Sequence, residues 1–268
     1  MPEGDTVWRA ARRLHAALAG HRLTAAELRH PRWSTVDLRG RTVTEVRSRG
    51  KHLLTRTVAD GGDAVTVHTH LGMDGSWRLY RAGERWSGGP GHQIRVVLST
   101  AEMSAIGYRL KQVTVVPTAA EDDIVGHLGP DLLGPDWDPA EAVRRLTAEP
   151  DRTVGAALLD QRNLAGIGNV YRAEVLFLRG VSPWTPVAGV ADLPALVTLA
   201  QRLLFTNRER PEQATTGSLR RGEQHWVYGR TGQPCRRCGT PVRSADLGDD
   251  PDDATVRRAY WCPSCQPE

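Results

Sequence analysis

The chain has 268 residues, of which 40% are hydrophobic, so it is long enough to bury the cores of two ordinary domains. Its formal net charge is +4 and its arginines occur in clusters, which suits a polyanionic partner but also a solvated basic surface. No segment resembles a signal peptide, and no run approaches the roughly 18 apolar residues that span a bilayer. These features exclude a membrane-spanning protein and predict a cytosolic one.

The first third of the chain predicts one helix followed by many short strands. Asp5 is placed to cap the helix and Gly20 to stop it. One face of this helix is apolar, with Val7, Ala11, Leu14 and Leu18. From about residue 23 to 117, β-rich runs alternate with glycine and predict a β-sandwich or barrel. The predicted strands are Thr42–Arg47, His52–Val58, Ala64–His70, Ser76–Tyr80, Gln93–Leu98 and Gln112–Val116.

Beyond the strands the pattern becomes helical. A small, acidic segment from Pro117 to Asp123 predicts a linker. Asp138, with Pro139 at the first helical position, predicts a helix start. Further helices are predicted over Thr153–Leu164, Asn169–Arg179 and Pro194–Thr206. We therefore predict an α+β protein of three domains, with a β-sandwich in residues 1–120, helices in residues 121–226 and a cysteine-rich ribbon in residues 227–268.

The four cysteines of the chain form two C-x-x-C pairs near its end. In a reducing compartment such pairs are poor disulfides and good metal thiolates. Four thiolates from two tight turns suit tetrahedral zinc, and a closed site of this kind holds a fold together and leaves no position for catalysis. The predicted ligands of one structural Zn²⁺ are Cys235, Cys238, Cys262 and Cys265. The segment between the pairs is longer than the usual 15 to 20 or so residues and is rich in aspartate.

A glycine-rich turn separates two predicted helices between Asp160 and Arg172. An apolar helix ends at Gly166-Ile167-Gly168, and Asn169 follows where an N-cap is expected. Unpaired backbone N–H groups at such a helix start can bind a phosphate, and the Asn169 amide adds a donor. The same turn is also explained as a simple connection between two packed helices.

Six motifs in this order resemble the formamidopyrimidine-DNA glycosylase and endonuclease VIII family. They are Pro2-Glu3-Gly4, Gly50-Lys51-His52-Leu53-Leu54, His70-Leu71-Gly72-Met73, the turn from Asp160 to Arg172, Val227-Tyr228-Gly229-Arg230 and the four-cysteine ribbon. The resemblance covers essentially the whole chain. It is closer to the endonuclease VIII branch, because Pro2-Glu3-Gly4 opens the chain and Tyr260-Trp261-Cys262-Pro263 closes the ribbon.

The resemblance implies a bifunctional DNA glycosylase and AP lyase of base excision repair that needs no organic cofactor. Its sandwich domain would be catalytic and its helical domain, a helix-two-turn-helix domain, would bind DNA. After removal of Met1, Pro2 would be the nucleophile at C1′, forming a Schiff base that leads to β,δ-elimination. Glu3 would move protons beside that amine. Lys51 and Arg257 would contact the backbone at the lesion, with Arg258 as the alternative to Arg257. Each residue has a simpler interpretation, since Pro2 also favours efficient Met1 removal and surface lysines are usually solvated.

The resemblance also implies contacts to damaged double-stranded DNA. Met73, with Leu71 as second choice, would fill the gap that a flipped base leaves, unless it packs in the sandwich. His70, His92, Asn169 and Tyr228 would contact phosphates, although His70 can equally be an ordinary strand residue. The segment from Arg208 to Trp226, which caps oxidised guanine in the purine-directed branch, is short here. Oxidised pyrimidines are therefore the expected substrates, acted on by a monomer.

Three alternatives to this prediction remain open. The chain can be a non-catalytic zinc-ribbon protein that binds nucleic acid, or an AP lyase with little glycosylase activity. It can also be a metal-dependent nuclease built on the acidic run from Asp249 to Asp253. Activity in the presence of a chelator would exclude the nuclease.

Overall fold

The computed structural model describes residues 2–248 and 256–267, and the chain divides between His127 and Leu128 into two compact units. The predicted division into three domains at residues 120 and 226 stays a prediction. In the described ranges, no helix has the length and apolar character that crossing a membrane requires.

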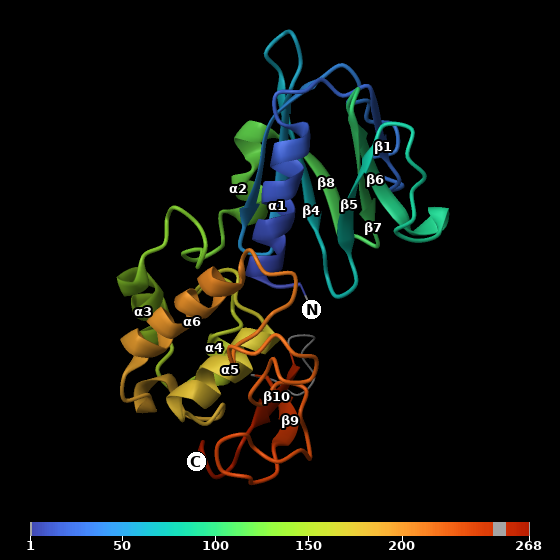
Figure 1. Ribbon diagram of the computed structural model, residues 1–268. Coiled ribbons are helices and arrows are strands. Elements are labelled where there is room, and N and C mark those ends of the chain that lie inside the picture. The colour runs from blue at the N-terminus through green and yellow to red at the C-terminus, as the bar shows by residue number, and fades with distance from the viewer. Residues whose placement is uncertain (1, 249–255, 268) are drawn as a thin grey trace. The chain divides into compact units, whose positions relative to one another are not determined.

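The first unit is a sandwich of two four-stranded antiparallel sheets (Figure 1). One sheet has the order β2 (Thr42–Arg49), β3 (His52–Val58), β4 (Ala64–His70) and β8 (Gln112–Pro117). The other has the order β1 (Ala25–Leu28), β6 (Ile94–Ser99), β7 (Met103–Tyr108) and β5 (Ser76–Arg81). Apolar side chains from both sheets, such as Leu53 and Leu98, share one core. Of these strands, β1 and β7 were not predicted.

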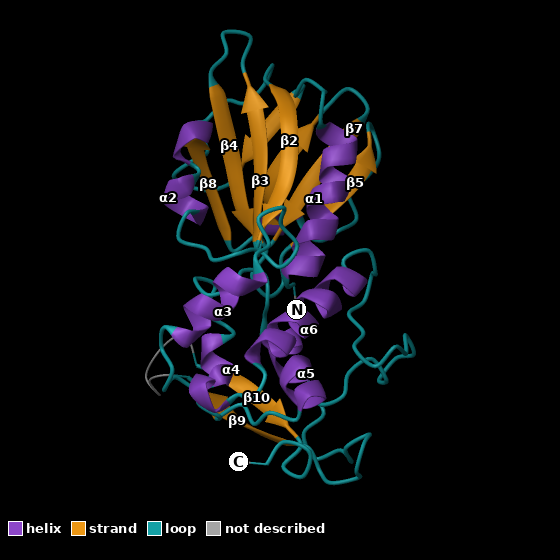
Figure 2. Ribbon diagram, turned by 90° about the vertical axis from the view of Figure 1, so that its left-hand side faces the viewer, coloured by secondary structure: helices purple, strands orange, loops and turns teal. Residues whose placement is uncertain are grey.

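Helix α1 (Gly4–Leu18) lies beside β2 and contributes its apolar face to the same core (Figure 2). The predicted buried face of Val7, Ala11, Leu14 and Leu18 is confirmed. The prediction that Asp5 caps the helix was wrong. Glu3 occupies the N-cap position, and its main-chain oxygen accepts from Val7 N at 3.0 Å, so the helix begins one residue before Asp5.

The segment that was interpreted as a linker is folded against the outer face of β3 and β4. It forms a 3₁₀ turn, Thr118–Ala120, and helix α2, Asp122–Val125. The Glu121 carboxylate accepts from Arg56 Nε at 2.8 Å and from Thr66 Oγ1 at 2.6 Å. Burial acts to raise the pKa of Glu121, but these hydrogen bonds outweigh it and lower the pKa below its usual range. This segment therefore covers the outer face of the sheet.

In its described residues the second unit contains four α-helices, one 3₁₀ turn, Val187–Gly189, and a small β-hairpin. The helices are α3 (Pro139–Thr147), α4 (Val154–Ala157), α5 (Asn169–Arg179) and α6 (Leu193–Asn207). The Asp138 carboxylate caps α3 by accepting from Ala140 N and Glu141 N, as predicted. The predicted helix Thr153–Leu164 was wrong beyond Ala157. There the side chains of Gln161 and Asn163 bond to main-chain carbonyls and replace helical hydrogen bonds.

The hairpin of the second unit consists of β9 (Arg243–Leu247) and β10 (Arg257–Trp261), paired antiparallel. Arg257 lies opposite Leu247, and Trp261 lies opposite Arg243. The acidic run from Asp249 to Asp253, on which the nuclease alternative rests, lies outside the described residues.

Candidate functional site

Two predicted site segments of the first unit lie at the same edge of one sheet. Strands β2 and β3 are joined by the two-residue turn Gly50-Lys51, in which Gly50 has a φ of +57°. This left-handed conformation favours glycine at the first position of such a turn. Because His52 pairs with His70, the turn lies beside the loop that leaves β4 with Leu71. Lys51 and the loop carrying Met73 are therefore neighbours.

The start of α1 lies at this same edge. Val46 N donates to His15 Nδ1 at 3.1 Å, and Gly20 N donates to Val43 O at 2.8 Å, so the helix runs antiparallel to β2. From His15 back to Gly4 the helix rises by about 16 Å. From Val46 onward to Lys51 the strand rises by about the same distance. The N-terminal end of α1 is therefore level with Lys51.

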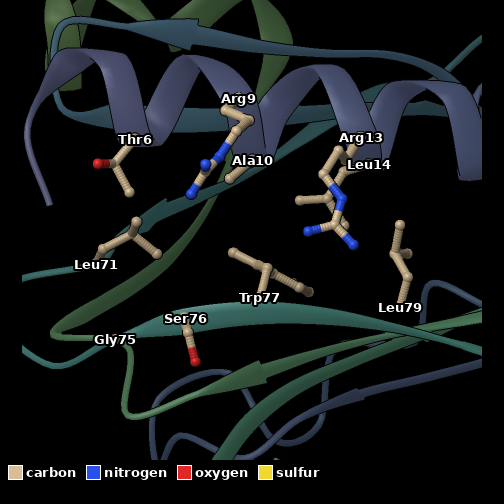
Figure 3. A pocket seen from close by; sticks show the side chains of 10 residues that line it. All are labelled: Thr6, Arg9, Ala10, Arg13, Leu14, Leu71, Gly75, Ser76, Trp77 and Leu79. Atoms are coloured by element: carbon tan, nitrogen blue, oxygen red, sulfur yellow. The ribbon is translucent and has the colours of Figure 1, made fainter. Parts of the chain in front are cut away.

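A cavity of about 120 Å³ connects the start of α1 to the loop after β4 (Figure 3). Thr6 and Arg9 of α1 line it on one side, and Leu71 and Trp77 line it on the other. Thr6 lies across from Leu71, so the first turn of the helix faces the base of the Met73 loop. Pro2, which precedes this turn, belongs to the same edge.

Pro2 and Glu3 are shielded to different degrees. Pro2 is partly exposed, whereas the side chain and backbone of Glu3 are together only 1% exposed. A carboxyl group withdrawn from bulk water exchanges protons best with a group placed directly against it. Glu3 is next to the Pro2 nitrogen in the chain, so this arrangement suits a local proton donor and acceptor.

The loop after β4 presents Met73 to solvent. Met73 is 66% exposed, whereas Leu71 is 3% exposed and belongs to the sandwich core. Gly72 has a φ of +65°, and a Cβ there would lie 2.8 Å from Cβ of Lys111, so glycine is required. Its N–H donates to Nδ1 of His70 at 3.0 Å. Of the two predicted gap-filling residues, only Met73 is available. His92 is exposed and lies in the 3₁₀ turn Gly91–Gln93, which is part of the connection between β5 and β6 of the other sheet.

Sequence analysis missed two residues at this edge. His52 follows Lys51 directly, and Lys111 donates its main-chain N–H to His70 O at 2.9 Å. His52 could have been found by asking which residues pair across the two predicted strands. Lys111 has no motif, and only the packing of the turn before β8 against Gly72 places it here.

In the second unit, Asn169 joins the helix-turn-helix to the ribbon. Gly168, and not Asn169, occupies the N-cap position of α5, so the capping prediction was wrong by one residue. The Asn169 Nδ2 donates to the main-chain oxygen of Arg258 at 3.0 Å. Its Oδ1 accepts from Arg172, which also donates to Arg258 O at 2.9 Å. The buried Arg172, missed by sequence analysis, therefore fixes β10 against α5 through Asn169.

The two ribbon arginines have different surroundings. Arg258 Nε donates to the Asp246 carboxylate on β9 at 3.1 Å. Arg257 lies one residue earlier on β10, so its side chain projects from the opposite face of the hairpin. Its Nη1 donates to the main-chain oxygen of Val256 at 2.7 Å. Arg258 is therefore paired with a carboxylate of the neighbouring strand, and Arg257 stays the predicted phosphate contact.

The segment that carries Tyr228 is held by a buried carboxylate that sequence analysis did not identify. Glu174 on α5 is fully buried, and its Oε1 accepts from the N–H groups of Val227 and Tyr228, each at 2.9 Å. Its Oε2 accepts from Trp226 N at 2.8 Å and from the hydroxyl of Thr215. Glu174 thus fixes the backbone on which Tyr228 is mounted.

The four cysteines form a compact cluster that can hold a metal ion, with all four sulfurs within 4.8 Å of one another. Sγ of Cys238 lies 3.5 Å from those of Cys262 and Cys265, and Cys235 Sγ lies 4.0 Å from Cys265 Sγ. Four sulfurs at about 2.3 Å from a tetrahedral zinc ion would be ~3.8 Å apart. The three measured sulfur–sulfur distances lie on both sides of this value, so the cluster fits such an ion.

Comparison with known proteins places these features in one family. Residues 1–116 match the formamidopyrimidine-DNA glycosylase N-terminal domain, and residues 128–216 match the H2TH domain of the same glycosylase. The chain is 59% identical to probable endonuclease 8 2 of Streptomyces coelicolor over 99% of this chain and 94% of the relative. It is 47% identical to the DNA-(apurinic or apyrimidinic site) lyase Nei2 of Mycolicibacterium smegmatis over 99% of both chains. A solved structure of Lactococcus lactis Fpg with abasic-site DNA shares the fold, with a TM-score of 0.79, 22% identity, and coverage of 99% of this chain and 100% of that one.

Proposed function

Because the chain belongs to the formamidopyrimidine-DNA glycosylase and endonuclease VIII family, on its endonuclease VIII branch, we propose that it is a DNA glycosylase and AP lyase whose nucleophile is Pro2. The observation that carries this proposal is the convergence of the α1 start, the Lys51 turn and the Met73 loop at one edge of the first unit. The substrate class that we propose is an oxidised pyrimidine in double-stranded DNA, taken by a monomer.

The proposed reaction begins when Met1 has been removed and the Pro2 nitrogen is a secondary amine. A terminal amine has a reference pKa of about 8, so a fraction of it is unprotonated near neutral pH. Its lone pair forms a bond to C1′ while the bond from C1′ to the damaged base breaks. The base leaves with the electrons of the broken bond and takes the proton that the Pro2 nitrogen gives up. The C1′–O4′ bond then opens to an iminium, and O4′ takes a proton from Glu3.

The iminium drives strand cleavage. Loss of a proton from C2′ expels the 3′ phosphate, and a second proton loss along the conjugated system expels the 5′ phosphate. Water then releases the sugar remnant and regenerates the amine. We assign Lys51 and Arg257 to the phosphates beside the lesion and Met73 to the gap in the helix. His70, His92, Asn169 and Tyr228 are the further proposed DNA contacts.

For the four-cysteine cluster we propose one structural Zn²⁺. Bound there, zinc would supply cross-linking of the two C-x-x-C turns, and no open coordination position would remain for substrate. The side chains of Cys235 and Cys262 are buried, so the metal would stabilise the ribbon from its core.

An excision assay tests the proposal. Met1-trimmed protein is incubated, with chelator present, with duplexes that carry thymine glycol, 8-oxoguanine or an abasic site. We expect thymine glycol to be excised best, and Pro2→Gly and Glu3→Gln to lose excision while the surface control Glu27→Gln keeps it. Salt-sensitive binding without cleavage of any duplex would overturn the enzymatic proposal. Because the Mycolicibacterium smegmatis relative is named as an AP lyase, cleavage of the abasic duplex alone would instead support an AP lyase with little glycosylase activity.

A further inference from the structure

Three histidines lie together on the outer face of the first sheet, directly after the Lys51 turn. His52 and His70 are opposite each other on β3 and β4, and His68 is two residues before His70, so all three imidazoles project from one face. Leu53 belongs to the core between the two sheets, which places the histidines on the opposite face. His68 is only 2% exposed.

The cluster adjoins both neighbouring segments of the candidate site, the Lys51 turn through the chain at His52 and the Met73 loop through a hydrogen bond at His70. Nδ1 of His52 and Nε2 of His68 are 2.8 Å apart, and their rings are stacked with centroids 5.0 Å apart. Since a hydrogen bond needs one donor and one acceptor, these two nitrogens share a single proton. Nδ1 of His70 accepts from Gly72 N, so the proton of a neutral His70 is on Nε2. The His52 and His70 rings meet edge to face with centroids 5.2 Å apart, so the cluster extends from the residue after Lys51 to the residue before Met73.

The cluster contains a polar atom that packing does not explain. Nδ1 of His68 is buried and has no hydrogen-bond partner among the described residues. Leaving such a group unpaired costs about 1–3 kcal/mol. An apolar side chain at this position of the strand would avoid that cost, so a buried imidazole needs a reason other than stability.

The surroundings keep all three imidazoles neutral. Burial, followed by the charges of neighbouring groups, lowers the pKa of His52 to about 3. Burial likewise lowers the pKa of His68 to about 4 and that of His70 to about 4. The titratable and charged groups that face the cluster are Lys51, Lys111, His127, Arg47 and, further along the same face, the ion pair of Arg56 and Glu121. Because the imidazoles are neutral, they do not repel the two neighbouring lysines, which are the cationic groups that would pair with a phosphate. Their unprotonated nitrogens can still accept hydrogen bonds.

We propose that His52, His68 and His70 are positioning residues that hold the Lys51 turn in register with the Met73 loop. The inference rests on the proposed function, in which both segments act on the same flipped nucleotide. His52 follows Lys51 directly in the chain. Nδ1 of His70 accepts a hydrogen bond from the main-chain N–H of Gly72, the residue before Met73. The hydrogen bond between His52 and His68 and the ring contact between His52 and His70 link these two attachments across β3 and β4. Misplacement of a reacting group by about 1 Å costs up to about 100-fold in rate, so such a tie has a kinetic effect.

The test compares His52 variants by single-turnover excision and by binding to the same duplex. His52→Phe keeps a flat ring but loses the hydrogen bond, and we expect its rate to fall on the order of tenfold with affinity within about twofold. His52→Asn places a polar atom where Nδ1 lies and should recover most of the rate. His21→Gln changes an exposed histidine and should have no effect. Equal rates for His52→Phe and the wild type would overturn the proposal.

A double-mutant cycle separates positioning from a purely structural role. If His52 acts through Lys51, then His52→Phe has no further effect in a Lys51→Met background. An equal fall in both backgrounds would show that the network only stabilises the sheet, and would overturn the proposal.

Nitrogen-15 NMR of the imidazoles tests the network without any reaction. We expect His52 and His68 to share one proton and to remain neutral down to about pH 5. Two rings that titrate independently near pH 6.5 would overturn the network itself. Absence of excision by the wild type would instead overturn the proposed function, so the two failures are distinguishable.

Discussion

Removal of the Glu174 carboxylate should release the segment that carries Tyr228. Glu174 is fully buried and accepts hydrogen bonds from three consecutive N–H groups, those of Trp226, Val227 and Tyr228. Hydrogen bonds to a charged acceptor contribute about 1.5–3 kcal/mol each, and a buried N–H without a partner costs about 1–3 kcal/mol. Glu174→Ala should therefore weaken local stability by about 3–5 kcal/mol.

Glu174→Gln is the more discriminating variant, because it keeps the shape of the side chain. One of its two terminal atoms becomes an NH₂ group, which cannot accept from a backbone N–H. Either Trp226 or the pair Val227 and Tyr228 then loses its acceptor. We expect a loss of about 2–3 kcal/mol.

Amide hydrogen exchange measures this effect directly. A loss of about 3 kcal/mol corresponds to exchange on the order of 100-fold faster at these amides. Glu212→Gln, a change at an exposed glutamate, is the matched control. Exchange at Trp226, Val227 and Tyr228 within about threefold of wild type in Glu174→Ala would show that the carboxylate does not hold this segment.

Three further perturbations have directions set by the structure. Cys262→Ser removes one of the four clustered thiolates, and zinc affinity should fall at least about 100-fold in a chelator competition titration. Met73→Ala should slow excision on the order of tenfold without changing the melting temperature, because Met73 is exposed. Leu71→Ala should instead destabilise the core by about 2–5 kcal/mol, because Leu71 is buried. The reverse pattern would contradict the assignment of Met73 to the gap. The folded-state pKa values of His52, about 3, and His68, about 4, lie below the ordinary histidine pKa of about 6.5. Between these pH values and about 6.5, the unfolded chain binds more protons than the folded chain. The contribution of the two histidines to the free energy of unfolding is therefore fully present above about pH 6.5 and decreases as the pH falls toward 4. Urea unfolding midpoints measured across this pH range test the expectation.

Local sequence patterns were sufficient for the elements with regular alternation or a clear cap. The strand His52–Val58 and the helix Asn169–Arg179 have the predicted bounds. Strand β7 was not predicted, because Met103-Ser104-Ala105-Ile106-Gly107-Tyr108 contains small residues and a glycine that weaken the strand signal. Its burial between β5 and β6 decides its conformation, and that is a tertiary effect.

The candidate site was predictable where a motif carries the chemistry and not where a partner lies far along the chain. Pro2, Lys51 and Met73 stand in recognisable motifs, and the structure places all three at one edge. Glu174 is one apolar-flanked glutamate in a helix, and its partners begin 41 residues later in the chain, at Thr215. Glu121 was assigned to a linker for the same reason, because its partner Arg56 is 65 residues away.

The most direct test of the central claim is borohydride trapping of Met1-trimmed protein on a duplex with an abasic site, followed by peptide mapping. We expect a covalent adduct on the Pro2 nitrogen that is absent from Pro2→Gly and resistant to chelator. An adduct that maps to Lys51 or another lysine, or cleavage without any trapped adduct, would contradict it.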